Sequence, residues 1–237
     1  VAWGAGPYGD GSGDYGGNRS NGGVCSLDKV KTQLVDVQSI YSTEQAFSAL
    51  KADGGIVAWG NHNHQAKVVL EPLSKLHGDG VVQATARAKY AIAALNTDGS
   101  VAAWGNKQHG GDCSGVQAQL VDVESVYATL AAFAALQADG GVVAWGHPKA
   151  GGDCSKVQAQ LVDVQSIYAT QAAFAALKAD GGVVAWGASG NYDDAGGDCS
   201  KVQSQLVDVQ SIYATNQAFA ALKADGGVVA WGWPETG

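Results

Sequence analysis

The sequence predicts an all-β protein, a β-propeller made of tandem antiparallel blades. Three observations predict it: a long string recurs along the chain, each copy holds an Asp-Gly pair between two apolar runs, and those runs are rich in β-branched and aromatic residues. The string FAALKADGGVVAWG stands at 174–187 and again at 219–232, with close variants at 47–60, 92–105 and 133–146. Such self-similarity indicates a repeat architecture in which neighbouring units share one core.

The tryptophan of each AWG marks the repeat, and five complete units of 41 to 56 residues separate Trp3, Trp59, Trp104, Trp145, Trp186 and Trp231. The chain opens on a lone VAWG at 1–4, so an incomplete ring is the alternative to a five-bladed ring. We expect a single propeller domain over residues 1–237. Its units fall at about 4–59, 60–104, 105–145, 146–186 and 187–231.

Each unit is expected to form a meander of three or four strands. Asp-Gly between apolar runs, as at Asp180-Gly181, is a strong hairpin signal because both residues tolerate a positive φ. Valine, isoleucine, tyrosine, phenylalanine and tryptophan dominate the flanks, as they do in strands. The alternative is a helix over the alanine-rich ATQAAFAALKADG, which ends in glycine. Strands are favoured by the Asp-Gly turn and by the two valines that follow it. Apolar residues also do not recur at the 3.6-residue spacing of a helix.

Composition narrows the classes of partner. The formal net charge is −8 and the pI is 4.9, and an acidic surface repels phosphate backbones, so we expect no nucleic-acid partner. No stretch of eighteen apolar residues occurs, so we expect a soluble protein with no membrane insertion.

Four cysteines occupy the same place in four units, each directly before serine. Equivalent positions on neighbouring blades lie too far apart for a disulfide, which needs Cα atoms within about 7 Å. Structural thiols copied with the repeat are therefore the favoured interpretation, and they suit a reducing compartment better than secretion. The residues are Cys25, Cys113, Cys154 and Cys199.

The pattern V-x-x-I-x-A-x-x-x-A-F-A-A-L-K-x-D-G-x-V-x-A-W-G resembles the repeat of the regulator of chromosome condensation propellers. The period of 41 to 45 residues is most similar to that of the β-lactamase inhibitor protein of this fold. The resemblance implies a propeller but no single function, because members of the family do unrelated things. Ala169, Thr170 and Phe174 replace the family's usual G-x-x-H, so no functional residue is carried over.

Metal and cofactor sites have only weak signals. Asp10, Ser12 and Asp14 alternate as the oxygen ligands of a Ca²⁺ loop do, but no glutamate stands at the twelfth loop position, which favours polar turn residues. G-x-G-x-x-G at 4–9 lacks the helix that a dinucleotide site needs. No Ser-His-Asp or Cys-His arrangement is evident, so we expect no catalytic residues and no cofactor.

Two loop positions vary between otherwise similar units, and repeat proteins bind through such loops. The first is the turn after Ala-Thr, at Glu44-Gln45, Arg87-Ala88-Lys89, Leu130-Ala131, Gln171-Ala172 and Asn216-Gln217. The second is the loop after W-G. We expect the two sets at different ends of the propeller. The second set has the aromatic anchors that interfaces favour, and unit two deviates most from the repeat. The predicted interaction residues are Tyr8, Tyr15, Arg87, Lys89, Tyr192, Asp193 and Trp233.

These observations predict a non-catalytic protein-binding scaffold, a peripheral subunit or interaction module of a larger complex. A large organellar complex would suit such a module. A small-ligand or glycan-binding propeller is the alternative, and an enzyme that uses the central channel is a third class for which no residues stand out.

Overall fold

The computed structural model describes residues 32–42, 46–52, 55–60, 82–190 and 194–235. The chain divides into two compact units, residues 1–80 and 81–237. One propeller domain over the whole chain stays a prediction. Among the described residues, no helix has the length and apolar composition that crossing a lipid bilayer requires.

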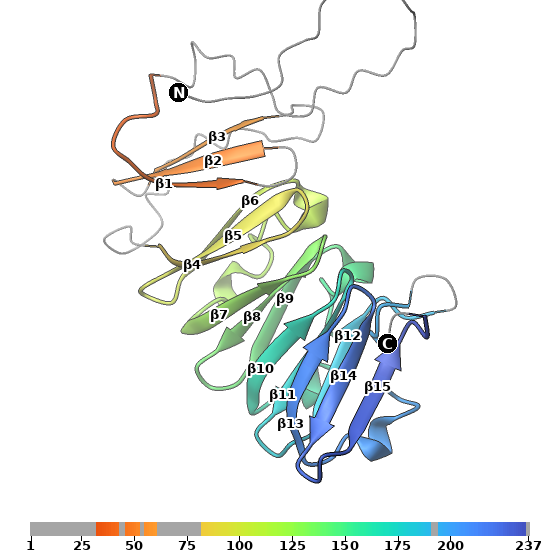
Figure 1. Ribbon diagram of the computed structural model, residues 1–237. Helices are drawn as coiled ribbons and strands as arrows, with labels where there is room; N and C mark the ends of the chain where they lie inside the picture. The colour runs from red at the N-terminus through yellow and green to blue at the C-terminus, as the bar shows by residue number, and fades with distance from the viewer. Residues whose placement is uncertain (1–31, 43–45, 53–54, 61–81, 191–193, 236–237) are drawn as a thin grey trace, which may run out of the picture. The chain divides into compact units, whose positions relative to one another are not determined.

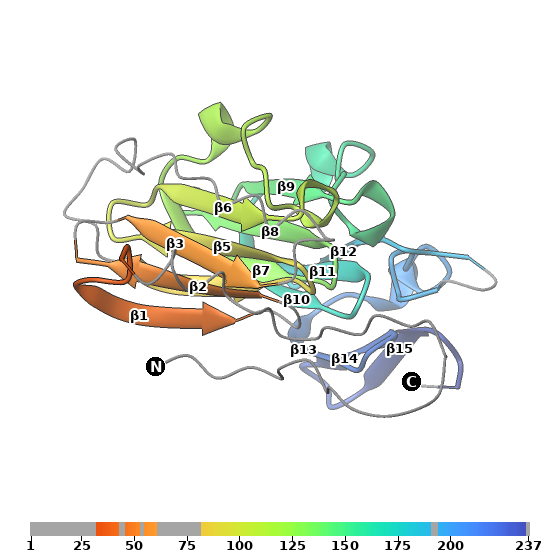
Figure 2. The ribbon, with the colours of Figure 1, turned by 90° about the horizontal axis from the view of Figure 1, so that it is seen from above.

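Each described repeat contains a three-stranded antiparallel sheet, called a blade below, whose strands pair in chain order. Unit 1 holds blade 1, made of β1 (Val37–Ser42), β2 (Ala46–Lys51) and β3 (Ile56–Gly60). In unit 2, blades 2 to 5 follow one another in chain order with their sheets side by side (Figures 1 and 2). Their strands are β4 (Val82–Arg87), β5 (Ala91–Asn96) and β6 (Val101–Gly105); β7 (Val123–Ala128), β8 (Ala132–Gln137) and β9 (Val142–Gly146); β10 (Val164–Ala169), β11 (Ala173–Lys178) and β12 (Val183–Gly187); and β13 (Val209–Ala214), β14 (Ala218–Lys223) and β15 (Val228–Gly232).

The alanine-rich segment is a strand, so the helical alternative is wrong. In blade 4 it forms β11, which pairs with β10 on one side and with β12 on the other. Phe174 and Ala175 point to opposite faces of the sheet and both are fully buried. The segment has no polar–apolar alternation because the central strand is buried on both faces.

The Asp-Gly hairpins form where the sequence predicts them, but with another turn. In blade 4, Gly181 N–H donates to the Lys178 carbonyl at 3.0 Å, and Lys178 N–H donates to the Gly182 carbonyl at 2.9 Å. Only Gly181 has a left-handed φ, of 77°. Asp180 accepts the Gly182 N–H on its side chain at 2.9 Å. The loop is therefore the three-residue hairpin with glycine in the left-handed position, and aspartate contributes an acceptor there and not a positive φ.

Adjacent blades in unit 2 share cores formed by opposite faces of their sheets. Between blades 3 and 4, Leu136 and Val142 pack with Ile167 and Trp186 in one buried cluster. Trp186 also stacks on Phe174 of its own blade, with 5.3 Å between ring centroids. The equivalent residues repeat this arrangement between blades 4 and 5. The face that a blade presents to its successor is thus small and aliphatic, and the face that it presents to its predecessor is aromatic.

The backbone also connects adjacent blades at the end where the Asp-Gly turns lie. Val164 N–H of blade 4 donates to the Gly140 carbonyl of blade 3 at 3.0 Å. Gly140 lies so close that a Cβ there would come within 2.9 Å of the Asp163 Cα. Asp163 itself has φ 54°, a left-handed conformation that aspartate adopts more readily than most residues. The Asp of LVDV and the Gly of Asp-Gly are therefore paired contact residues between blades.

Three cysteines, Cys113, Cys154 and Cys199, are buried free thiols, which agrees with their interpretation as structural residues. Cys25 lies outside the described residues. Each described thiol donates to a glutamine four residues later, as Cys154 Sγ does to Gln158 Oε1 at 3.1 Å. Burial raises the pKa of all three thiols, so little thiolate forms near neutral pH.

We expect these three thiols to react with a disulfide reagent much more slowly in the folded protein than in denaturant, because the thiolate is the nucleophile and burial reduces both its amount and its access. The kinetics of thiol release at pH 8 measure this directly. The variant Ala159→Cys places a thiol at an exposed position of the 3₁₀ helix Gln158–Gln160 and should react at once. Native cysteines that react as fast as this added thiol would contradict the expectation.

Candidate functional site

Both variable loop positions lie at one end of the blades in unit 2, called the loop end below. In blade 4 the last strand ends at Gly187, which pairs with Ala173 at the start of β11. The loop after β12 therefore begins beside the turn that joins β10 to β11. The expectation that the two sets lie at different ends is wrong. A meander of three strands finishes beside its own first turn, and only a fourth strand would have carried the chain to the opposite end.

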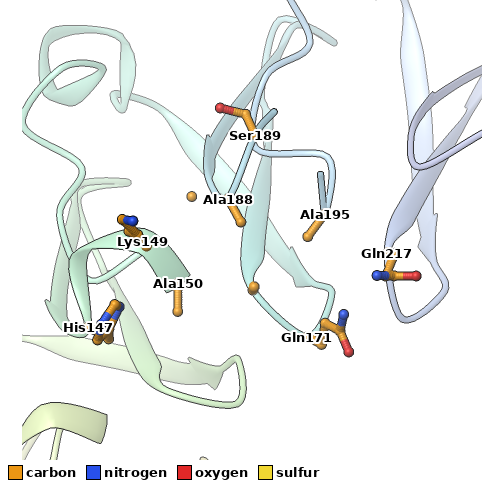
Figure 3. A pocket seen from close by; sticks show the side chains of 10 residues that line it. His147, Lys149, Ala150, Gln171, Ala188, Ser189, Ala195 and Gln217 are labelled. Atoms are coloured by element: carbon orange, nitrogen blue, oxygen red, sulfur yellow. The ribbon is translucent and has the colours of Figure 1, made fainter. Parts of the chain in front are cut away.

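A pocket of about 420 Å³ opens at the loop end of blades 3, 4 and 5 (Figure 3). Its walls are the loop after β9, the first turn and last loop of blade 4, and the first turn of blade 5. Ligand pockets in proteins measure about 300–1,000 Å³, so this one can hold a short peptide segment or a small polar molecule. The lining residues are His147, Lys149, Ala150, Gln171, Ala172, Gly187, Ala188, Ser189, Ala195 and Gln217.

The wall that carries His147 and Lys149 is a short, well-braced loop. Pro148–Ala150 form one turn of 3₁₀ helix, which begins after His147 and ends at Gly151 with φ 94°. Proline suits the first helical position because its missing N–H needs no partner there. His147 N–H donates to the Ala131 carbonyl at 2.8 Å, and its carbonyl accepts the N–H of Ala150. The His147 and Lys149 side chains are both exposed, and these hydrogen bonds hold the backbone that carries them.

Buried threonine hydroxyls hold two of the four alanines in the lining, Ala150 and Ala195. Thr170 Oγ1 donates to the Ala195 carbonyl at 2.8 Å and accepts the Ala173 N–H at 3.1 Å. Thr129 Oγ1 makes the equivalent bond to the Ala150 carbonyl at 3.0 Å. A buried hydroxyl is costly unless it is hydrogen-bonded, so each threonine holds the following W-G loop in one position.

The first turns of successive blades are bonded to one another in series. The Lys89 N–H of blade 2 donates to the Leu130 carbonyl of blade 3 at 2.8 Å. The Leu130 N–H donates in turn to the Gln171 carbonyl of blade 4 at 2.8 Å, and the Gln171 N–H to the Asn216 carbonyl of blade 5 at 2.9 Å. This series sets the spacing between adjacent turns. As a result, Gln171 and Gln217 line the pocket from neighbouring blades (Figure 3).

The lining offers hydrogen-bonding groups and a positive charge. Gln171 and Gln217 supply amide donors and acceptors, Ser189 a hydroxyl and Lys149 an ammonium group, and no described lining residue is acidic. The alanines leave room between them. Such a set can hold peptide carbonyls, a carboxylate or sugar hydroxyls. In the part of the chain that the structure describes, no group of three or more His, Cys, Asp or Glu residues could hold a metal ion.

Three of the predicted interaction residues fall within the described chain. Trp233 directly follows β15 and is half-buried. Its backbone N–H donates to the Gln217 carbonyl at 3.0 Å, which places it next to a pocket residue. Lys89 lies at the first turn of blade 2, with Nζ 5.2 Å from the centroid of the Tyr90 ring, a cation–π distance. Arg87 ends β4 of the same blade. The structure thus places Trp233 in blade 5 and Lys89 and Arg87 in blade 2, and it does not join them into one cluster.

The other predicted residues lie outside the described ranges. They are Tyr8, Tyr15, Tyr192 and Asp193 among the interaction residues, and Asp10, Ser12 and Asp14 among the metal ligands. Their roles stay predictions. His147 and Lys149 were not singled out from the sequence, although they stand in a loop already identified as variable. Counting three strands to a blade would have placed that loop at the same end as the turn that carries Gln171.

Repeated three-stranded blades with Asp-Gly hairpins and a Phe-Trp stack have the β-propeller fold that the sequence predicted, and they resemble the blades of RCC1. No family model matches the sequence, and no curated protein matches it.

Solved structures do match. Yeast RCC1 (Prp20), crystallised bound to Kap60, is 19% identical with a TM-score of 0.51, over 84% of this chain and 57% of that one. Prp20p from Saccharomyces cerevisiae has the same identity and TM-score, over 84% of this chain and 59% of that one. Human WBSCR16 is 20% identical with a TM-score of 0.45, over 83% and 61%. The chain spans less than two thirds of the length of each, and the likeness to Prp20 shows the fold.

Proposed function

We propose that the chain is a non-catalytic protein-binding scaffold that holds its partner at the loop end of unit 2. The observation that carries this proposal is a pocket lined by residues that differ between blades of nearly identical framework. β11 and β14 share the sequence AFAALK, whereas the turns before them read Gln171-Ala172 and Asn216-Gln217. A constant framework with variable loops is the arrangement that repeat proteins use for recognition.

The likeness to Prp20 supports a protein as the partner. That protein has been crystallised bound to Kap60, and its binding properties to Gsp1p and histones have been described. For this chain we propose a role as a peripheral subunit or interaction module of a larger complex, with a large organellar complex as one such setting. The net charge of −8 disfavours a direct nucleic-acid partner.

We expect Lys149→Glu to weaken partner binding by about tenfold or more, because it puts a negative charge where an interface would use a positive one. Gentle native purification followed by mass spectrometry of stoichiometric partners makes the measurement. Lys156→Glu is the matched control, since it makes the same change at an exposed position outside the pocket lining. Equal retention of the partner by all three proteins would argue against the loop end as the binding site.

A small-ligand or glycan-binding function is the second candidate, and the volume and polar lining of the pocket favour it. Gln171 is the residue to test, since the equivalent turn position in blade 3 is Leu130. Gln171→Leu therefore introduces a residue that the fold already accepts at that place. Saturable binding on a glycan array that disappears in this variant would support the second candidate. An array without binding would leave the protein partner as the better proposal.

A further inference from the structure

The pocket at the loop end contains a lysine that has no carboxylate partner within the described chain. Three other lysines of unit 2 each pair with an aspartate close in sequence, at 2.9, 3.4 and 3.6 Å between nitrogen and oxygen: Lys107–Asp112, Lys178–Asp180 and Lys223–Asp225. Lys149 makes no such pair with any described residue. The described carboxylate next to the lining belongs to Asp194, and its Oδ1 accepts the Gly196 N–H at 2.8 Å. The ammonium group of Lys149 is therefore open to an anionic group from another molecule.

Two glutamines on another wall of the pocket offer the groups that pair with a peptide backbone. Gln171 and Gln217 lie on the first turns of blades 4 and 5, whereas Lys149 lies on the loop after β9 (Figure 3). The backbone N–H and carbonyl of both glutamines are already bonded within the fold, so their side chains remain for a ligand. A side-chain amide carries both donors and an acceptor, and it can therefore pair with the carbonyl and the N–H of an extended peptide.

An exposed leucine lies beside the pocket on blade 3. Leu130 is 46% exposed, whereas the equivalent residues of blades 4 and 5 are the polar Gln171 and Asn216. Its N–H and its carbonyl are both bonded into the series of first turns, and the next residue, Ala131, accepts the N–H of His147. Leu130 thus lies next to the pocket wall formed by the loop after β9. Its side chain is an apolar surface on a backbone that is already ordered, and covering it would favour binding.

We propose that the pocket receives an aspartate or glutamate side chain from an extended segment of a protein partner, and that an aliphatic side chain of the same segment packs on Leu130. This inference rests on the proposed function and names the chemistry of the segment that binds. The carboxylate pairs with Lys149, because hydrogen bonds between charged groups are stronger than neutral ones. The amides of Gln171 and Gln217 hold the backbone of the segment.

The arrangement of the first turns favours a side chain over a chain terminus as the source of the carboxylate. The series of bonded turns continues past the pocket, from Leu130 to Lys89 of blade 2, so a segment can run across the loop end without ending there. The chain as a whole carries a net charge of −8, which repels an acidic segment elsewhere on its surface. The cation in the pocket therefore contributes specificity as well as attraction.

Selection from a random-peptide phage library on the full chain tests the proposal. The displayed peptides are joined to the coat protein at their C-termini, so any carboxylate that is selected is a side chain. We expect the enriched peptides to share an aspartate or glutamate close to an aliphatic residue. Fluorescence anisotropy of one enriched peptide, synthesised with an amidated C-terminus, then gives its affinity. That affinity should fall as salt is added, because salt screens an exposed charge pair.

Three variants of the chain assign the contacts. Lys149→Gln should weaken binding of this peptide by about tenfold and remove most of its salt dependence, whereas Lys149→Arg should retain both. Leu130→Gln introduces the residue that blade 4 has at the equivalent position, so the fold accepts it, and it should also weaken binding by about tenfold. Lys156→Gln is the matched control, since it removes the same charge at an exposed position outside the pocket lining and should leave binding unchanged.

The inference is overturned if no peptide is enriched, if the enriched peptides lack an acidic side chain, or if Lys149→Gln and Lys156→Gln bind the peptide equally. These results are distinct from failure of the proposed function. Enriched peptides without a carboxylate that lose binding in Gln171→Leu would leave the loop end as a protein-binding site and change only the chemistry of its partner. The proposed function itself fails if the natural partner is retained equally by the Lys149→Glu and Lys156→Glu proteins.

Discussion

Replacing Trp186 by alanine is expected to lower the free energy of unfolding by about 3–5 kcal/mol. The side chain is buried in the cluster between blades 3 and 4 and stacks on Phe174. Its indole N–H donates to the Gly151 carbonyl at 3.0 Å. Alanine leaves a large cavity, and it also leaves a buried carbonyl without its donor. Urea denaturation followed by far-UV circular dichroism gives the change.

Trp186→Phe reduces the loss of packing, because it keeps an aromatic ring for the stack while it removes the indole donor and part of the buried ring. We expect it to cost about 1–3 kcal/mol, the range for leaving a buried polar group unsatisfied. A typical domain is stable by only about 5–15 kcal/mol, so the alanine variant should approach unfolding at moderate temperature. An alanine variant that lost less than the phenylalanine variant would contradict the assignment of Trp186 to the shared core.

The blades could be predicted from the sequence because their signals are local. The recurring tryptophan gave the period, and Asp-Gly gave the position of each hairpin. The turn type could not be predicted in this way, since Asp180 accepts a hydrogen bond where a positive φ was expected. The alanine run was ambiguous because Phe174 and Ala175 are both buried. A strand between two sheets shows no alternation, and that is the pattern by which strands are usually recognised.

The candidate site was harder to predict because it depends on distances between repeats. Both variable loop sets are visible in the sequence, but the expectation that they lie at different ends kept His147 apart from Gln171. In the sequence, Thr170 stands out only as a departure from the family pattern. In the structure this threonine is buried and holds the next loop through the Ala195 carbonyl. The first fact depends on a contact between neighbouring blades, and the second on a loop 25 residues further along the chain, so neither can be read from local spacing.

Gly152→Ala is expected to destabilise the protein by about 3 kcal/mol or more, at the upper end of the range for overpacking. A Cβ at Gly152 would lie 2.4 Å from the carbonyl carbon of Gly146 and 2.5 Å from its oxygen. Both atoms are backbone, so no side chain can rotate to relieve the contact. The φ of Gly152 is not left-handed, so alanine is penalised by the contact alone. Thermal unfolding and urea denaturation both measure the loss.

Gly115→Ala is the matched control, because it makes the same substitution where a Cβ would meet nothing within 4 Å and the φ is not left-handed. Alanine there should be neutral, or stabilising by about 0.4–1 kcal/mol through a less flexible unfolded chain. Gly152 lies one residue beyond Gly151, which ends the 3₁₀ turn that carries Lys149, so any shift that relieves its clash also moves a wall of the pocket. We therefore expect Gly152→Ala to weaken partner binding even where it remains folded, and Gly115→Ala to leave binding unchanged. Equal stabilities of the two variants would mean that the loop after β9 is not packed against Gly146, and the rigid pocket wall inferred from that contact would have to be abandoned.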